Sequence, residues 1–329
     1  MTFRALVLRQ LEDRRTKAGF ESLEMKDLPD DDVLVRVTHS SLNYKDGLAI
    51  TGKGKIARIF PLVLGIDLAG EVVESRTDAW KPGDAVLATG WGLGEEHFGG
   101  YAEFARLEPH MLTRIPKDRD AAWAMALGTA GFTAMLAVVS LEEHGVRPED
   151  GPIVVTGASG GVGSAAVRSL AAAGYEVVAS TGRPELEAYH KSLGASDVLP
   201  RAELSRPSRP LESDRWAGAI DNIGSETLAT ILSQTKRAGA VASCGLAGGM
   251  DLPTTVFPFI LRGVALLGID SNFCPAERRN LIWNRLADVF TPEIVETMSE
   301  TVPLEDVPAW AERIMNGQVR GRTVVHISS

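Results

Sequence analysis

The chain has very little cysteine: Cys244 and Cys274 are the only two among 329 residues. Two thiols are too few for a disulfide framework or for a zinc lobe held by four thiolates. Basic residues are also in deficit, with 34 Lys and Arg against 43 Asp and Glu and a formal net charge of −9. Because nucleic-acid-binding proteins usually carry a basic excess, this balance argues against general binding of nucleic acid. A local basic pocket for an anionic metabolite stays open.

Signals that would direct the chain to a membrane or out of the cell are not evident. Arg4 and Arg9 interrupt the first apolar run, which is therefore too short for a signal peptide. We also expect no membrane-spanning segment, which needs about 20 consecutive uncharged residues. Hydrophobic residues make up 44% of the sequence, enough for a globular core. We therefore expect a cytoplasmic protein with two domains, since a domain typically has about 150 residues.

The pattern of local structure changes along the chain. Short β-type runs such as 34–38 and 68–73 alternate with turns before residue 110 and indicate a β-rich domain. Segment 121–141 favours helix, and Gly128 and Gly131 within it predict two helices rather than one. After residue 151 strands and helices alternate, which is typical of a parallel, doubly wound sheet.

A glycine-rich turn follows the predicted strand 152–156 and opens a helix that we expect to end near Gly174. Its glycines let backbone N–H groups approach a pyrophosphate at the positive end of that helix. The alternative is a tight strand–helix connection that binds no ligand. The glycines expected to lie against this pyrophosphate are Gly157, Gly160, Gly161 and Gly163.

Three fingerprints compete for this turn. The usual G-x-G-x-x-G is not met, because position 159 is Ser. The T-G-x-x-x-G-x-G of short-chain dehydrogenases is met, but that family needs a Tyr-x-x-x-Lys pair for proton transfer. Tyr175 and Tyr189, the tyrosines beyond the turn, are followed four residues later by Ala179 and Leu193. Short-chain chemistry is therefore excluded, and A-x-x-G-x-x-G of the medium-chain dehydrogenases/reductases remains, with Gly157 as its first small residue.

The end of the next strand selects between the two dinucleotides. An Asp or Glu there would bind the 2′-OH of NAD. The sequence instead has Ser180, Thr181, Gly182 and Arg183, whose hydroxyls and guanidinium suit a 2′-phosphate. NADPH is therefore favoured. In a simpler interpretation, Thr181 caps the following helix and Arg183 is merely solvated. These local roles are compatible with binding of a 2′-phosphate.

Over its whole length the sequence resembles the medium-chain dehydrogenases/reductases. Motifs that carry this resemblance include 65–72 (GIDLAGEV), 81–84 (KPGD), 99–104 (GGYAEF) and 128–134 (GTAGFTA). Within that superfamily the sequence is most similar to the acrylyl-CoA reductase branch of the quinone-oxidoreductase-like proteins. The distinctive strings are 43–46 (NYKD), 180–183 (STGR), 199–201 (LPR), 268–272 (GIDSN) and 321–325 (GRTVV).

This resemblance implies an α/β fold with a Rossmann NADPH-binding domain at 127–271. A GroES-like β-rich substrate domain would combine 1–126 with 272–329. The implied reaction is NADPH-dependent reduction of acrylyl-CoA, or a related enoyl thioester, to the saturated product. A homodimer joined near 265–269 is also implied. The alternatives are a quinone or enone reductase with the same cofactor, and a non-catalytic NADPH-binding protein.

The zinc-dependent branch of the superfamily is a poor match. Its alcohol dehydrogenases have Cys where this chain has Asn43, and a His-Glu pair where it has Ile66 and Asp67. Tetrahedral catalytic zinc needs three protein donors, so we expect no metal. The histidines lack ligand spacing and are expected on the surface or in the core; they are His39, His97, His110, His144, His190 and His326.

The substrate-domain motif 43–46 holds the candidate catalytic residues. Tyr44 is the expected donor to the thioester oxygen or the proton source, although water is an alternative source. Lys45 could lower the pKa of Tyr44 or hold phosphate, and Asp46 could orient Lys45; a local turn and ion pair is the alternative. The resemblance implies a larger set of positions that hold the cofactor, namely Tyr44, Ser159, Gly160, Gly161, Val162, Thr181, Gly182, Arg183, Arg201, Leu246, Ile260, Ser271 and Asn316. Asn316 could instead end a helix before Gly317.

A basic loop follows Tyr44 closely. We expect Lys53, Lys55 and Arg58 in this loop to meet the phosphates of CoA. Because charged residues mostly face solvent, a solvated loop without a ligand is an equal alternative.

Overall fold

The computed structural model describes residues 1–327 and divides the chain into two compact units. Unit 1 combines residues 1–129 with the C-terminal part from Ser271 onward, and unit 2 is Ala130–Asp270. Within the described residues, the sheets and the buried apolar clusters of one unit are separate from those of the other, with two sheets and two clusters in unit 1 and one of each in unit 2.

Unit 2 is built around a fully parallel sheet, as the alternation of strands and helices predicts. Its strand order is β11-β10-β9-β12-β13-β14, so the chain starts in the middle of the sheet and winds toward each edge. A crevice for a dinucleotide lies where such an order reverses, at the carboxyl ends of the central strands. The strands are β9 (Ile153–Val155), β10 (Val177–Thr181), β11 (Asp197–Pro200), β12 (Trp216–Asp221), β13 (Thr235–Ser243) and β14 (Ala265–Gly268).

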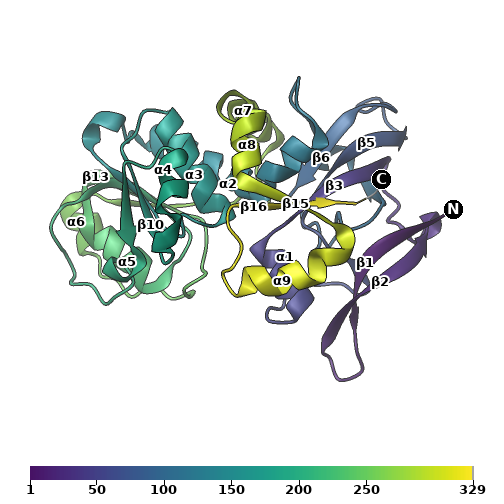
Figure 1. The fold of residues 1–329 in the computed structure, drawn as a ribbon, viewed down its shortest axis with the longest axis horizontal. Coiled ribbons are helices and arrows are strands. Elements are labelled where there is room, and N and C mark those ends of the chain that lie inside the picture. The colour runs from purple at the N-terminus through teal and green to yellow at the C-terminus, as the bar shows by residue number, and fades with distance from the viewer. Residues whose placement is uncertain (328–329) are drawn as a thin grey trace. The chain divides into compact units, whose positions relative to one another are not determined.

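Helices cover both faces of this sheet (Figure 1), with α3 and α4 on one side and α5 on the other. Gly174 has φ 86° and follows the end of α3, which confirms the predicted stop. Short 3-10 turns lie at Pro148–Asp150, Pro184–Leu186 and Arg201–Glu203. The helices are α3 (Gly161–Ala172), α4 (Glu187–Ser192), α5 (Ser225–Gln234) and α6 (Phe257–Arg262).

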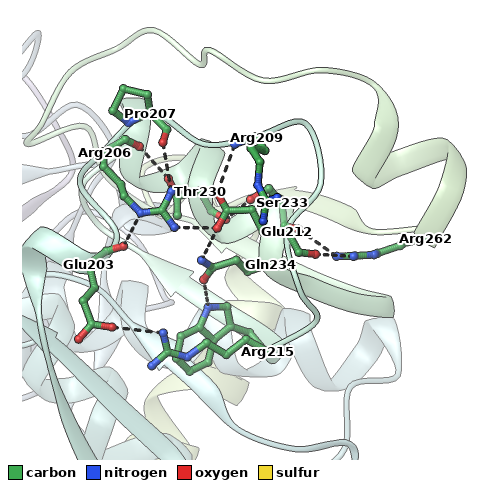
Figure 2. Close-up of polar contacts among 11 residues, drawn as sticks. Glu203, Arg206, Pro207, Arg209, Glu212, Arg215, Thr230, Ser233, Gln234 and Arg262 are labelled. Atoms are coloured by element: carbon green, nitrogen blue, oxygen red, sulfur yellow. Dashed lines mark hydrogen bonds and ion pairs between the residues drawn. The ribbon is translucent and has the colours of Figure 1, made fainter.

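The segment 201–215, rich in Pro, Ser and charge, is a loop that several hydrogen bonds hold in place (Figure 2). The Glu212 carboxylate accepts hydrogen bonds from Arg206 at 2.8 and 2.7 Å and from Gln234 Nε2 at 2.8 Å. Arg262 on α6 donates to the main-chain oxygen of Glu212 at 2.6 Å. The hydrogen bonds from Arg206 are the largest cause that lowers the pKa of Glu212 to about 2.

Unit 1 contains a mixed sheet of order β15-β16-β3-β5-β6-β8, with β7 paired to β3, and a smaller antiparallel sheet of order β2-β1-β4. The turn before β6 is closed by Asp84, whose carboxylate accepts the N–H of Lys81, three residues back, at 2.9 Å. The strands are β1 (Thr2–Gln10), β2 (Thr16–Glu24), β3 (Val33–Leu42), β4 (Leu62–Val63), β5 (Asp67–Ser75), β6 (Ala85–Thr89), β7 (Phe104–Leu107), β8 (Thr113–Arg114), β15 (Ser299–Pro303) and β16 (Arg322–His326).

Helices α1 and α9 pack closely against each other within unit 1 (Figure 1). Gly47 makes this approach possible, because a Cβ there would lie 2.8 Å from Cγ2 of Ile314. Short 3-10 turns lie at Met25–Asp27, Pro109–Met111 and Leu304–Asp306. The helices of this unit are α1 (Tyr44–Thr51), α7 (Ala276–Val289), α8 (Pro292–Met298) and α9 (Val307–Met315).

The long helix α2 (Ala121–His144) corrects one sequence expectation and confirms another. It breaks at Gly128, with φ 50° and ψ −153°, as predicted, whereas Gly131 lies within its continuous part. The expectation that no segment is long and apolar enough to span a membrane was wrong, because the length and composition of α2 would suffice. However, 89% of its most apolar 18-residue stretch is buried inside the fold, which is typical of a core helix.

Candidate functional site

The turn between β9 and α3 has the backbone geometry that a pyrophosphate requires. Gly157 has φ 58°, a conformation that favours glycine, and its carbonyl accepts the N–H of Gly160 at 2.9 Å. A Cβ at Gly163 would collide with the same carbonyl, so glycine is required where α3 crosses the turn. Gly160 is the N-cap of α3 and has no side chain to cap it. The first N–H groups of α3 are therefore suited to an anion.

Hydroxyl groups lie at the end of β10, directly beside this turn. Thr181 Oγ1 is 2.8 Å from Ser159 Oγ and accepts the main-chain N–H of Arg183 at 3.0 Å. Thr181 thus closes the turn after β10 instead of capping the helix that begins at Pro184. Arg183 is also more than solvated, because its Nη2 donates to the main-chain oxygen of Ser159 at 3.1 Å.

A second guanidinium group, that of Arg201, lies at the same edge of the sheet. Thr181 pairs with Pro200 across β10 and β11, which places Arg201 at the carboxyl end of the neighbouring strand. Gly182 permits this arrangement, since a Cβ there would lie 3.1 Å from Cζ of Arg201. The predicted residues Ser159, Thr181, Arg183 and Arg201 are therefore brought together, and they suit a nucleotide phosphate.

One residue of this cluster was missed by sequence reasoning. His190 on α4 is 0% exposed, and its Nε2 lies 3.0 Å from Ser159 Oγ. Burial, and next the charge of Arg183, lower its pKa. No sequence signal could have found it, because its contact joins residues 31 positions apart and α4 is too short to define an inward face.

The other predicted cofactor residues lie in different places. Leu246 follows the end of β13, as expected, and is 60% exposed, while Ile260 lies on α6 and is 68% exposed. Ser271 and Asn316 belong to unit 1. The Ser271 carbonyl accepts Arg279 Nη2 at 3.0 Å, and Asn316 ends α9 before Gly317, whose φ is 67°. The helix-ending interpretation of Asn316 is thus confirmed, and its contact with the cofactor stays a prediction.

In unit 1, Tyr44 is the first residue of α1 and is 42% exposed. The expectation that Asp46 orients Lys45 beside Tyr44 was wrong. Lys45 Nζ is paired with Glu95 at 2.6 Å, whereas Asp46 is buried and accepts the N–H groups of Asn43 at 2.9 Å and Ile66 at 3.0 Å. Consecutive residues of a helix do not face each other, so Asp46 supports the start of α1 instead of orienting Lys45.

A buried polar network surrounds Asp67, beneath the start of α1. The Asp67 carboxylate accepts Asn43 Nδ2 at 2.9 Å and the N–H of Thr129 at 2.9 Å, and it lies 3.9 Å from Arg322 Nη2. By the resemblance, Asn43 stands where the zinc-dependent branch has a Cys, and Ile66 and Asp67 stand where it has a His-Glu pair. Within residues 1–327, His, Cys, Asp and Glu side chains form no group of three or more that could hold a metal ion.

The three cations of the basic loop after α1 differ in their surroundings. Lys53 is paired with Glu312 on α9 at 3.3 Å, and both side chains are about half exposed. The side chains of Lys55 and Arg58 are exposed. The loop therefore presents cations to solvent, and its contact with CoA stays a prediction.

Comparison with known proteins places this geometry in a family. The alcohol dehydrogenase GroES-like domain family matches residues 29–117, and the zinc-binding dehydrogenase family matches residues 161–287. The chain is 53% identical over 324 residues to "Probable acrylyl-CoA reductase AcuI" of Escherichia coli K12, covering 98% of this chain and 99% of the relative. It is 48% identical to "Acrylyl-CoA reductase AcuI" of Ruegeria pomeroyi, covering 99% and 100%. The chain belongs to the acrylyl-CoA reductase family of medium-chain dehydrogenases/reductases.

A solved structure supports this membership. The yhdH oxidoreductase of Salmonella enterica, crystallised in complex with NADP, superimposes with a TM-score of 0.96 at 51% identity, covering 99% of this chain and 100% of that one. The predicted fold, a Rossmann sheet combined with a GroES-like domain, is thus confirmed. As a member of this family the chain is an oxidoreductase, so the alternative of a non-catalytic binding protein is not favoured.

Proposed function

We propose that this chain is an NADPH-dependent reductase of acrylyl-CoA and of related short 2-enoyl-CoA thioesters. The observation that carries the proposal is identity of 53% and 48% over nearly the whole chain to proteins named as acrylyl-CoA reductases. The phosphate-binding turn and the two guanidinium groups at the ends of β10 and β11 supply what such an enzyme needs for NADPH.

The residues of unit 2 fit this cofactor. First-turn N–H groups of α3 would hold the pyrophosphate, and the hydroxyls of Ser159 and Thr181 with Arg183 and Arg201 would hold the 2′-phosphate. When bound, NADPH supplies a hydride for the β-carbon of the enoyl thioester. The relative crystallised with NADP supports this choice of dinucleotide.

The protein must then stabilise negative charge on the thioester oxygen and let a proton reach the α-carbon. Tyr44 is the side chain that we propose for this task, because its phenol is partly exposed at the N-terminus of α1. A donor aimed at the developing oxyanion lowers the barrier. Tyr44 Oη is also a possible source of the α-proton, with water as the alternative. Lys53, Lys55 and Arg58 are the candidates for the phosphates of CoA.

We further propose that two copies pair through the edge of the unit 2 sheet. Among residues 1–327, β14 is the last strand in the order and pairs with a strand on one side only, which leaves its other side for a partner strand. Exposed apolar side chains accompany this edge: Leu266 on β14, and Phe257, Ile260 and Leu261 on α6. Burial of such a patch in a dimer would remove it from water. Location in the cytoplasm stays a prediction.

The assay that tests this function follows the loss of NADPH absorbance with acrylyl-CoA and, separately, with a simple quinone. Turnover with acrylyl-CoA and formation of propionyl-CoA are expected. Preference for the quinone would favour the alternative activity. Tight NADPH binding without turnover of either compound would contradict both activities and favour a non-catalytic protein.

A further inference from the structure

His190 lies fully buried beside the phosphate-binding turn, although it belongs to none of the motifs. Its Nε2 is 3.0 Å from Ser159 Oγ, while its Nδ1 has no hydrogen-bond partner in the described part of the chain. Burial of a polar group is costly unless it forms hydrogen bonds. The hydrogen bond with Ser159 is therefore the contact that offsets part of the cost of burying the imidazole.

A short chain of hydrogen bonds connects His190 to the end of β10. The N–H of Arg183 donates to Thr181 Oγ1 at 3.0 Å, Thr181 Oγ1 is 2.8 Å from Ser159 Oγ, and Ser159 Oγ meets His190 Nε2. The N–H at one end of this chain can only donate. The two hydroxyl protons in the middle are therefore distributed according to what His190 does at the other end.

The tautomer of His190 decides whether a hydroxyl proton remains for a ligand. If Nδ1 carries the proton, Ser159 must donate to Nε2 and Thr181 to Ser159, so both hydroxyl protons are used. If Nε2 carries it, His190 donates to Ser159, and one hydroxyl proton of the Ser159–Thr181 pair stays free. The first arrangement also leaves a buried Nδ1–H without an acceptor, which is rarer in proteins than an unpaired acceptor.

The neutral form is the relevant one. His190 is enclosed by the fold, and Arg183 places a positive charge nearby; both lower the pKa of His190. The imidazole therefore carries a single N–H at neutral pH, and the two tautomers are the only choices.

We propose that His190 is a positioning residue for cofactor selection, donating its Nε2–H to Ser159 so that a hydroxyl proton of the Ser159–Thr181 pair is free for a phosphate oxygen. This rests on the proposed function, because it concerns NADPH. Thr181 ends β10, where a Rossmann unit places the 2′ substituent of the adenosine ribose. The free proton is thus assigned to the 2′-phosphate, which NADH lacks.

Cofactor titration without substrate tests this role. Dissociation constants for NADPH and NADH are measured by nucleotide fluorescence for the wild type, His190→Leu and His190→Gln. His190→Leu should weaken NADPH about tenfold and NADH less than about twofold, because only NADPH uses the free hydroxyl proton. His190→Gln retains an N–H donor at a similar reach and should restore most of the preference. Tyr189→Phe, which removes a buried hydroxyl from the same helix, should leave the preference unchanged.

The same titration in a Ser159→Ala background isolates the coupling. If His190 acts through Ser159, His190→Leu should add little to the loss of NADPH affinity that Ser159→Ala already causes. Equal weakening of both nucleotides by His190→Leu, or additive losses in the double variant, would overturn the proposal. A residue that only fills the core would weaken the binding of both nucleotides equally.

The tautomer is read directly by nitrogen NMR of the wild type, with the His190 signals assigned by their loss in His190→Gln. Protonation at Nε2 is expected, and protonation at Nδ1 would refute the inference. If the wild type binds neither nucleotide, the proposed function fails and the inference fails with it. If the wild type prefers NADPH but His190→Leu keeps that preference, only the inference fails.

Discussion

Asp67 and Arg322 are buried together beneath the start of α1, with exposures of 0% and 3% and 3.9 Å between Oδ2 and Nη2. Both also bind the surrounding backbone and side chains: Arg322 Nη2 donates to Ser41 Oγ at 2.7 Å, and Asp67 Oδ2 accepts the N–H of Thr129 at 2.9 Å. Thr129 follows the break at Gly128, where a Cβ would lie 2.5 Å from Asp67 Oδ2. The pair therefore joins β5, β16 and the kink of α2.

Asp67→Asn should destabilise the protein strongly. It leaves the buried Arg322 without its counter-charge, and breaking a buried pair in this way costs about 3–5 kcal/mol. The measurement is the free energy of unfolding in urea. The double variant Asp67→Asn with Arg322→Met removes the stranded charge and should recover part of the loss.

Glu71→Gln provides the matched control, since Glu71 and Arg36 form an exposed pair at 3.3 Å between the neighbouring strands β3 and β5. Its effect should stay below about 1 kcal/mol. Comparable losses in Asp67→Asn and Glu71→Gln would contradict an energetic role for the buried pair.

The stability of the protein should depend on pH through Asp46. Burial, and next the charge of Asp67, raise the pKa of Asp46 from 3.8 to about 7. The folded state therefore holds this proton more tightly than the unfolded chain does. The resulting stabilisation is fully present below about pH 4 and is lost as the pH rises to about 7, by at most about 1.4 kcal/mol per pH unit.

Asp46→Asn should remove this component. The difference in unfolding free energy between the wild type and Asp46→Asn is measured at several pH values between about 4 and about 7. The wild type should lose stability relative to the variant as the pH rises. Asp78→Asn, which alters an exposed carboxylate, should run parallel to the wild type. Parallel curves for Asp46→Asn as well would show that Asp46 does not titrate in this range.

The sequence predicted the sheet of unit 2 correctly because its signals are local. A strand, a glycine turn and a helix lie within about 30 residues in a Rossmann unit. The same applies to the break at Gly128 and to the stop at Gly174, where a single glycine carries the signal. Membership of the family followed from the order of such motifs.

The details of the site depend on contacts that sequence neighbours do not reveal. Lys45 meets Glu95, 50 positions away, instead of its neighbour Asp46. His190 contacts Ser159, 31 positions away, and Glu212 accepts a hydrogen bond from Gln234 at the end of α5. Such partners are set by the packing of whole elements, and the composition of 201–215, rich in Pro, Ser and charge, does not reveal them.

Glu212→Gln should loosen this loop. The charge-assisted hydrogen bonds from Arg206 are lost while the side-chain volume stays, and the expected cost is about 1 kcal/mol because Arg206 is partly exposed. Since the pKa of Glu212 is lowered to about 2, this stabilisation is present above about pH 4.5 and is lost as the pH falls toward 2. Proteolysis of the loop and thermal unfolding are the measurements.

Glu203→Gln is the control for this prediction. Glu203 and Arg215 form a neighbouring pair at 3.4 Å in which both side chains are more than 40% exposed (Figure 2). An exposed pair of this kind contributes little. If Glu203→Gln loosened the loop as much as Glu212→Gln, general charge rather than the Arg206–Glu212–Gln234 contacts would hold it.

Tyr44→Phe should slow the reduction of acrylyl-CoA more than about tenfold, which corresponds to roughly 1.4 kcal/mol of barrier. The hydroxyl is removed while the aromatic ring stays, so contact of the ring with NADPH and the start of α1 should change little. Turnover numbers and Michaelis constants separate these effects. Tyr175→Phe is the control, because its hydroxyl donates to the main-chain oxygen of Val146 at 2.8 Å within unit 2 and belongs to the core. A loss of turnover below about tenfold in Tyr44→Phe would mean that water, and not the tyrosine, delivers the proton to the α-carbon.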